Sequence, residues 1–145
     1  MIKLYEVGGS IRDELLGRPN NDRDFVAVCP QGWDALVKWS EDNLDKVFLR
    51  RDFTMNAMAR EVDLETFEPM GEIIDPLFGS MDISERVIRI VHPEDSDSCH
   101  DYIGETFKRM IEDPLRLIRA LRFCVTLELT LSPNLSAILR YNEFH

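Results

Sequence analysis

The spacing of hydrophobic residues changes several times in the first 30 residues, and each change predicts one element. Residues 3–7 have the composition of a short strand. Ile11 and Leu15 are four apart, as on one face of a helix, and Gly17 marks the end of that helix. Residues 24–28 are rich in Val and Phe and predict a second strand. The chain therefore begins as strand, helix, strand.

The middle of the chain contains both the helical spacing of three to four residues and the two-residue alternation of strands. Residues 31–44 carry an apolar stripe with helical spacing, and residues 53–59 alternate as a strand does. Residues 62–72 are acidic and predict a loop, and a turn is expected at residues 75–79. Residues 87–91 are almost all β-branched and predict another strand.

The last third of the chain is predicted to be helical after an irregular segment at residues 93–101. Five apolar residues recur at steps of three and four: Ile111, Leu115, Ile118, Leu121 and Val125. Ser132-Pro133 is a typical helix start, with serine as the cap and proline in the first turn. The predicted organisation is an α/β (α+β) unit over residues 1–91, followed by a helical segment over residues 101–145.

The apolar positions of these elements predict one hydrophobic core. Its expected members are Leu4, Val7, Phe25, Val26, Val28, Phe53, Ile74, Ile88, Ile90, Leu115, Ile118 and Leu121.

Composition narrows the class of protein. The 145 residues are 44% hydrophobic, which is enough for one packed domain and too much for a disordered chain. The sequence contains no run of about 18 apolar residues, which a membrane-spanning helix would need. We therefore expect a cytoplasmic protein. The three cysteines form no CxxC pair, which argues against a thiolate metal site.

The net charge of −10 argues against non-specific coating of nucleic acid, because that mode needs a broad excess of Lys and Arg. The charge is unevenly spread, however. Residues 107–124 hold five basic residues against two acidic ones. A basic helix is therefore expected, on which Arg119 and Arg122 are candidate RNA contacts.

Two short motifs near the N-terminus suggest phosphate and metal chemistry. Gly8, Gly9 and Ser10 lie between a strand and a helix, where the backbone can approach a phosphate, and Arg12 can add a charged donor. A plain turn is the simpler interpretation of these glycines alone. Asp22 and Asp24 are two apart, so their carboxylates share one face of a strand and can hold Mg²⁺ with substrate phosphates. A lone pair of this kind is more often solvated, but its place shortly after the glycine turn favours a metal site for a nucleoside triphosphate.

A third motif runs from Arg50 to Ala57. Adjacent arginines such as Arg50 and Arg51 suit a polyphosphate, and Asp52 or Asn56 can bond ribose hydroxyls. A solvated charge cluster before a strand is the alternative.

The fourth motif is Glu112-Asp113-Pro114-Leu115-Arg116. Asp113 and Arg116 are three apart and are neighbours on a helix surface. A carboxylate accepts from the exocyclic amine of C or A, while an arginine donates to ring acceptors. The alternative is structural, with Asp113 capping the helix and Pro114 in its first turn.

Taken in order, these motifs resemble those of the bacterial-type (class II) CCA-adding tRNA nucleotidyltransferases and their kin, the bacterial poly(A) polymerases. Leu15-Leu16-Gly17-Arg18 and Ile74-Asp75-Pro76-Leu77-Phe78-Gly79 also fit this family. The resemblance covers about residues 4–125 and implies a nucleotidyltransferase-like head with a small mixed sheet, followed by helices. It implies addition of CMP and AMP from CTP and ATP to the 3′ end of tRNA by two Mg²⁺ ions.

The resemblance also implies roles for individual residues. Asp22 and Asp24 would hold the Mg²⁺ ions. The triphosphate would contact Gly8, Gly9, Ser10 and Arg12, and the sugar and phosphates would contact Arg51 and Asp52. Asp113 and Arg116 would read the base, with Glu112 in support.

Two departures from the family affect what is expected of this chain. Only 25 residues separate Asp24 from Arg50, where the family has a longer stretch with a third catalytic carboxylate. Glu61 and Asp63 are the nearest candidates for that carboxylate. The helical body that grips tRNA is also expected to be missing beyond His145, which would expose apolar surface and favour association. A non-catalytic nucleotide-binding or partner-binding remnant, or a poly(A)-adding relative, is therefore kept as an alternative.

Overall fold

The main sheet is small and mixed. The computed structural model describes residues 2–28, 40–41, 44–92 and 103–143. The four strands lie in the order β3-β2-β1-β4, with β1 antiparallel to β2 and β4, and β3 parallel to β2. Their bounds are β1 Lys3–Val7, β2 Asp24–Val28, β3 Ser40–Glu41 and β4 Ala59–Val62. The predicted strands at residues 3–7 and 24–28 and the small mixed sheet are confirmed.

Helices make up most of the rest. Their bounds are α1 Gly9–Leu15, α2 Leu44–Leu49, a 3-10 helix Thr54–Asn56, α3 Gly79–Glu85, α4 Ile103–Glu112, α5 Leu115–Thr126 and α6 Pro133–Glu143. A second sheet pairs β5 (Val87–Ile88) with β6 (Thr130–Leu131) in parallel. Within the described residues, no helix is both long and apolar enough to cross a membrane.

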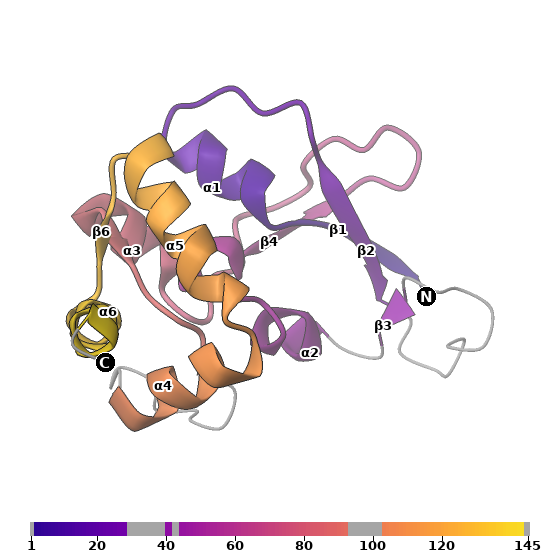
Figure 1. Ribbon diagram of the computed structural model, residues 1–145. Helices are drawn as coiled ribbons and strands as arrows, with labels where there is room; N and C mark the ends of the chain where they lie inside the picture. Colours follow the sequence, from indigo (N-terminus) through magenta and orange to yellow (C-terminus); the bar gives the residue numbers. More distant parts are fainter. Residues whose placement is uncertain (1, 29–39, 42–43, 93–102, 144–145) are drawn as a thin grey trace.

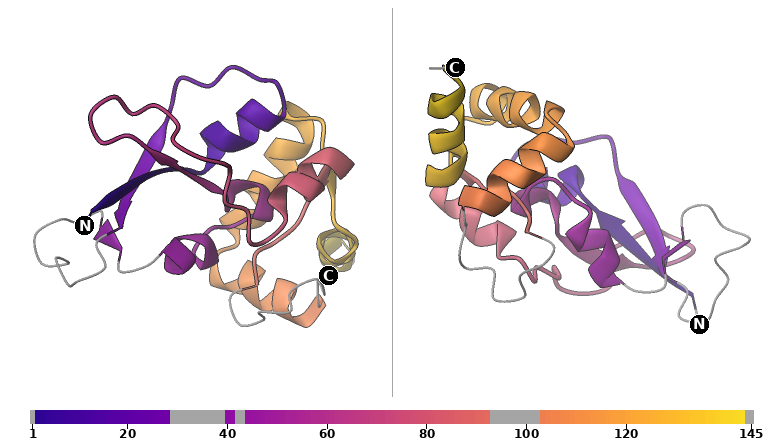
Figure 2. Two further views of the ribbon diagram at one scale, coloured as in Figure 1. Left: turned by 180° about the vertical axis from the view of Figure 1, so that it is seen from behind. Right: turned by 60° about the horizontal axis from the view of Figure 1, so that its bottom comes forward.

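The sheet and the C-terminal helices lie on opposite sides of the molecule (Figure 1). Figure 2 gives the same arrangement from behind and from below, with α3 beside the group of C-terminal helices and α1 and α2 nearer the sheet. Two groups of buried residues follow this division. One joins the sheet to α2 through residues such as Val26 and Phe48, and the other joins α1, the 3-10 helix and the C-terminal helices around Ile11, Phe53 and Leu135.

The strand expected at residues 53–59 is wrong. Residues 54–56 form the 3-10 helix, and a strand begins only at Ala59. All residues from Phe53 to Ala59 except Asn56 are buried, so the segment is covered on both sides and the apparent alternation does not mark an exposed face. The expected turn at residues 75–79 leads into α3, where the carboxylate of Asp75 accepts hydrogen bonds from two backbone N–H groups.

Part of the expected core is also wrong. Leu115, Ile118 and Leu121 are exposed on α5, as is Ile74 before α3. Leu4 and Phe25 are half-buried, and the other expected members are buried. The opposite side of α5 enters the core through Ala120 and its neighbours. This helix has apolar residues on two faces. The exposed face carries the apolar residues that recur at steps of three and four in the sequence.

Two further helical predictions have mixed outcomes. The helix expected over residues 31–44 lies largely outside the described residues, and β3 and α2 were not foreseen. The C-terminal helix begins at Pro133 as predicted, and the hydroxyl of Ser132 accepts a hydrogen bond from the Leu135 N–H at 3.4 Å.

Candidate active site

The turn after β1 brings an arginine close to the backbone. Gly8 has a φ of 81°, in the left-handed region that favours glycine. A Cβ atom at Gly8 would lie 3.4 Å from Nη1 of Arg51. The structure therefore brings together the glycine turn and the Arg51 motif, which are 43 residues apart in the sequence.

Asp22 and Asp24 lie beside this turn. β2 begins at Asp24, which pairs with Val7, the residue before Gly8. Both aspartates are exposed, and no residue of the described chain bonds to either carboxylate. Mg²⁺ takes one or two carboxylates together with phosphate oxygens of a substrate. The pair therefore fits a magnesium ion whose other ligands come from a bound triphosphate and water.

The third carboxylate is not found at the expected candidates. Glu61 and Asp63 belong to β4 and the loop after it, and β1 separates β4 from the strand of Asp24. Glu61 lies 3.6 Å from Nζ of Lys3, and Asp63 accepts two backbone hydrogen bonds in its own turn. Two strand spacings of about 4.8 Å separate β4 from β2, and Glu61 is in register with Val26 and not with Asp24, so this arrangement does not favour a metal shared with Asp24. In the described part of the chain, no three His, Cys, Asp or Glu side chains are grouped to hold a metal.

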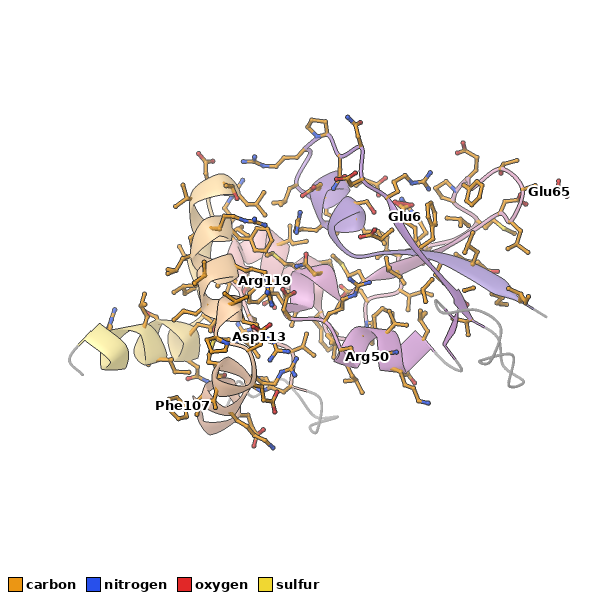
Figure 3. All side chains as sticks on the ribbon, turned by 45° about the vertical axis from the view of Figure 1, so that its right-hand side comes forward. Glu6, Arg50, Glu65, Phe107, Asp113 and Arg119 are labelled. Atoms are coloured by element: carbon orange, nitrogen blue, oxygen red, sulfur yellow. The ribbon has the colours of Figure 1, made fainter. Side chains whose placement is uncertain are left out.

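A continuous chain of hydrogen bonds joins residues of three motifs. Nη1 of Arg12 donates to Oδ1 of Asn56 at 2.8 Å, and Nδ2 of Asn56 donates to Oδ1 of Asp52 at 3.2 Å. Arg119 then donates from Nε to Oδ2 of Asp52 at 3.1 Å and from Nη2 to Oδ2 of Asp113 at 3.0 Å. Figure 3 shows Arg119 on α5 near Asp113, which lies between α4 and α5. The motifs that were separate in the sequence therefore meet through their side chains.

The guanidinium of Arg12 is held by neighbouring side chains. Its Nε lies 2.9 Å from Oδ1 of Asp13, and its guanidinium lies 4.9 Å from the ring centre of Phe123. Only 11% of its side chain is exposed. In this structure Arg12 joins α1 to the 3-10 helix and to α5.

The side chain of Ser10 faces a different part of the surface from Asp24. It is buried and lines a depression of about 320 Å³ together with Glu6, two further glutamates and three arginines. Glu6 pairs with Phe25 in the sheet, whereas Asp24 pairs with Val7, so Glu6 and Asp24 point to opposite faces. The structure therefore does not bring Ser10 together with Asp24.

The fourth motif is held in place by a buried arginine that the sequence did not single out as a site residue. Arg109 on α4 donates to the backbone oxygen of Arg51 at 3.2 Å and to Glu112 at 3.2 Å. Nη1 of Arg116 donates to the backbone oxygen of Arg109 at 2.7 Å and lies 3.6 Å from Glu112. Burial and the nearby Arg116 lower the pKa of Arg109. This network connects the motif of Glu112 and Arg116 to the backbone of Arg51.

The two arginines expected to contact RNA have different surroundings. Arg122 is exposed, with its guanidinium 5.3 Å from the ring centre of Phe123. Arg119 has two carboxylate partners. No local sequence signal identifies Asp52 as one of them, because it lies 67 residues away along the chain.

Comparison with known proteins now identifies the family. The Poly A polymerase head domain model matches residues 31–89. The chain is 31% identical to the Multifunctional CCA protein of Xanthomonas oryzae pv. oryzae, over 96% of this chain and 40% of that protein. The corresponding protein of Burkholderia ambifaria is 32% identical, with the same coverage. The chain belongs to the CCA-adding enzyme family.

Solved structures agree with this assignment. A tRNA nucleotidyltransferase complexed with a primer tRNA and an incoming ATP analogue has a TM-score of 0.68 and 30% identity, covering 97% of this chain and 46% of that one. The Bacillus stearothermophilus CCA-adding enzyme in complex with CTP has a TM-score of 0.66 and 32% identity, covering 92% and 38%.

The chain spans about 40% of the length of the curated relatives it matches. Its alignment with the Xanthomonas protein has 183 positions for a chain of 145 residues, so that protein carries at least 38 residues with no counterpart here. An internal shortening relative to that protein is confirmed, and its expected place between Asp24 and Arg50 stays a prediction.

Proposed function

We propose that this chain transfers CMP and AMP from CTP and ATP to the 3′ end of tRNA, without a template and in the cytoplasm. The observation that carries the proposal is the hydrogen-bonded chain from Arg12 to Asp113. It joins motif residues expected to contact the phosphates, the ribose and the base of one nucleotide. The CTP, ATP analogue and primer tRNA in the related structures support the same substrates.

Asp22 and Asp24 would hold Mg²⁺ on the exposed edge of β2. Mg²⁺ bound there would favour ionisation of the attacking 3′-hydroxyl and neutralise charge on the departing pyrophosphate. In the transfer, the 3′ oxygen of the RNA bonds to the α-phosphorus of the nucleotide. The bond from that phosphorus to the oxygen bridging it to the β-phosphorus breaks, and pyrophosphate leaves.

The remaining residues bind and orient the substrates. Arg51, beside Gly8, supplies positive charge for the triphosphate, and Asp52 and Asn56 accept and donate hydrogen bonds to ribose hydroxyls. The carboxylate of Asp113 accepts from the exocyclic amine of cytosine or adenine, and Arg116 donates to a ring acceptor.

Among the described residues only two carboxylates are placed for the metal, and two ligands in place of three predict slow transfer. A lost metal ligand weakens the stabilisation of charge in the transition state, and each 1.36 kcal/mol lost is about tenfold in rate. We therefore propose a slow enzyme, whose nucleotide binding is less affected than its rate of transfer.

The decisive experiment supplies a tRNA that lacks its 3′ CCA, with CTP and ATP separately and together in Mg²⁺. We expect incorporation of C and then A, and its loss in the Asp22→Ala, Asp24→Ala double variant. A Glu65→Ala, Glu72→Ala variant is the matched control, because it removes two exposed acids in and after the loop that follows β4. Equal incorporation by both double variants would overturn the metal assignment.

A second candidate is a non-catalytic nucleotide-binding remnant. It is favoured by the lack of a three-acid metal group among the described residues. Mg²⁺-dependent binding of CTP without any incorporation would support it. Incorporation of A alone would instead indicate a poly(A)-adding relative.

A further inference from the structure

Arg119 contacts two carboxylates that come from different parts of the chain. Its Nε donates to Asp52 at 3.1 Å and its Nη2 donates to Asp113 at 3.0 Å. Its side chain is 34% exposed, so it lies at the edge of the site and not in the core. A guanidinium has donors fixed in one plane, so it holds two acceptors in a defined relative position.

The carboxylate of Asp113 has one donor on each oxygen. Oδ1 accepts from the backbone N–H of Leu115 at 3.1 Å, and Oδ2 accepts from Arg119. Each oxygen keeps a further lone pair for another donor. Two donors from different directions fix the plane of the carboxylate, whereas the Leu115 bond alone leaves it free to rotate.

The direction of the remaining lone pairs matters for base choice. An ionised carboxylate only accepts, so it attracts the exocyclic amine of C or A and repels the carbonyl oxygen that U or G presents at the equivalent position. The Arg119 hydrogen bond has the largest effect on the pKa of Asp113 and lowers it, burial raises it by less, and the Leu115 N–H lowers it further. Asp113 is therefore ionised at neutral pH.

From this geometry we infer that Arg119 is a positioning residue for nucleotide choice, which orients the Asp113 carboxylate toward the base and fixes it relative to Asp52. This inference rests on the proposed function, because it requires that a nucleotide base lies against Asp113. It gives Arg119 a role distinct from the RNA contact expected from the sequence. Arg119 acts through Asp113 and does not itself touch the base.

The test measures the dissociation constants of CTP and UTP in Mg²⁺ by equilibrium dialysis, for the full chain and its variants. Arg119→Met removes both ion pairs while keeping a long side chain. We expect the preference for CTP over UTP to fall by about tenfold or more, the size of effect lost with one good base contact. The affinity for UTP should change little, because the triphosphate contacts remain. Arg140→Met is the matched control, because Arg140 is an exposed arginine on α6 with no assigned role in the site, and it should keep the preference.

Two further variants separate positioning from general stability. Arg119→Lys keeps the charge but cannot bond both carboxylates in one plane, so we expect an intermediate preference with a cooperative unfolding transition like that of the unchanged chain. In a double-mutant cycle with Asp113→Asn, the two losses should not add, because both remove the same oriented acceptor.

Each outcome decides the matter. If Asp113→Asn loses the preference while Arg119→Met and Arg119→Lys keep it, the positioning role is wrong and the proposed function stands. Additive losses in the cycle would also overturn it. If the unchanged chain binds CTP and UTP equally, the base-selecting part of the proposed function fails, and the role of Arg119 fails with it.

Discussion

The guanidinium of Arg12 on α1 donates to the side-chain oxygen of Asn56 at 2.8 Å, across 44 residues of sequence. The same guanidinium bonds Asp13 and lies over the ring of Phe123. One side chain therefore connects the segment after the glycine turn with the 3-10 helix and α5. These contacts hold the three elements together, in addition to any contact that Arg12 makes with a substrate.

The contacts of Arg12 with these elements predict that its removal lowers the stability of the fold. Arg12→Ala should lower the free energy of unfolding by about 2–3 kcal/mol, from a charged hydrogen bond and a cation–π contact. Urea denaturation measures it. Arg18→Ala is the control, because Arg18 is exposed and pairs with no acid among the described residues, and it should change stability by less than about 0.5 kcal/mol. Equal effects of the two variants would show that the contacts of Arg12 do not stabilise the fold.

Gly79 is predicted to tolerate no side chain. A Cβ atom there would lie 2.2 Å from the backbone oxygen of Thr54, where α3 packs on the 3-10 helix. Gly79→Ala should destabilise the protein by about 1–3 kcal/mol or more, because backbone atoms must move apart. Gly104→Ala, in α4, meets nothing within 4 Å and should be neutral or slightly stabilising. Thermal unfolding of the two variants compares them directly, and a stable Gly79→Ala protein would contradict the close packing.

Glu6 predicts an acid-sensitive contribution to stability. Burial raises the pKa of Glu6, but the hydrogen bond from Arg23 at 2.8 Å, the hydroxyl of Ser10 and the charge of Arg23 together outweigh it, so the pKa lies below its ordinary value of 4.5. A carboxyl with a depressed pKa stabilises the fold above its unfolded pKa and loses that effect as the pH falls through the folded pKa. The unchanged chain should therefore lose more stability below about pH 4.5 than Glu6→Gln does.

The measurement is the free energy of unfolding from pH 7 to pH 3. At pH 7, Glu6→Gln should be less stable by about 1–3 kcal/mol, as expected for a charged hydrogen bond. The two curves should approach each other as the pH falls. Parallel curves would show that Glu6 is not the group responsible.

The two faces of the C-terminal helices predict different responses to the same substitution. Ile138 on α6 is 4% exposed, whereas Ile118 on α5 is 63% exposed. Ile138→Ala should cost about 2–5 kcal/mol because it leaves a cavity, and Ile118→Ala should cost less than about 1 kcal/mol. Chemical denaturation of both variants tests whether the apolar stripe of α5 is outside the core. A large loss for Ile118→Ala would mean that the stripe is packed.

Local signals in the sequence were sufficient for several elements. The glycine turn, the short alternating strands and the Ser132-Pro133 start each depend on residues close together in the chain, and β1, α1, β2 and α6 follow them. The ordered motifs likewise indicated the family that the comparisons support. The spacing of hydrophobic residues did not indicate which apolar face of an element is buried in the core. Segment 53–59 is buried on both sides, and α5 presents apolar side chains in two directions.

The sequence by itself determined which residues are proposed for the site, because motif spacing is a property of the chain. Only the tertiary structure decided how they meet: Arg12 reaches Asn56, and Arg119 reaches both Asp52 and Asp113. It also separated Ser10 from Asp24 and Glu61 from any shared metal site, through the order and pleat of the strands. Such pairings depend on contacts between residues far apart in the chain, and no local period encodes them.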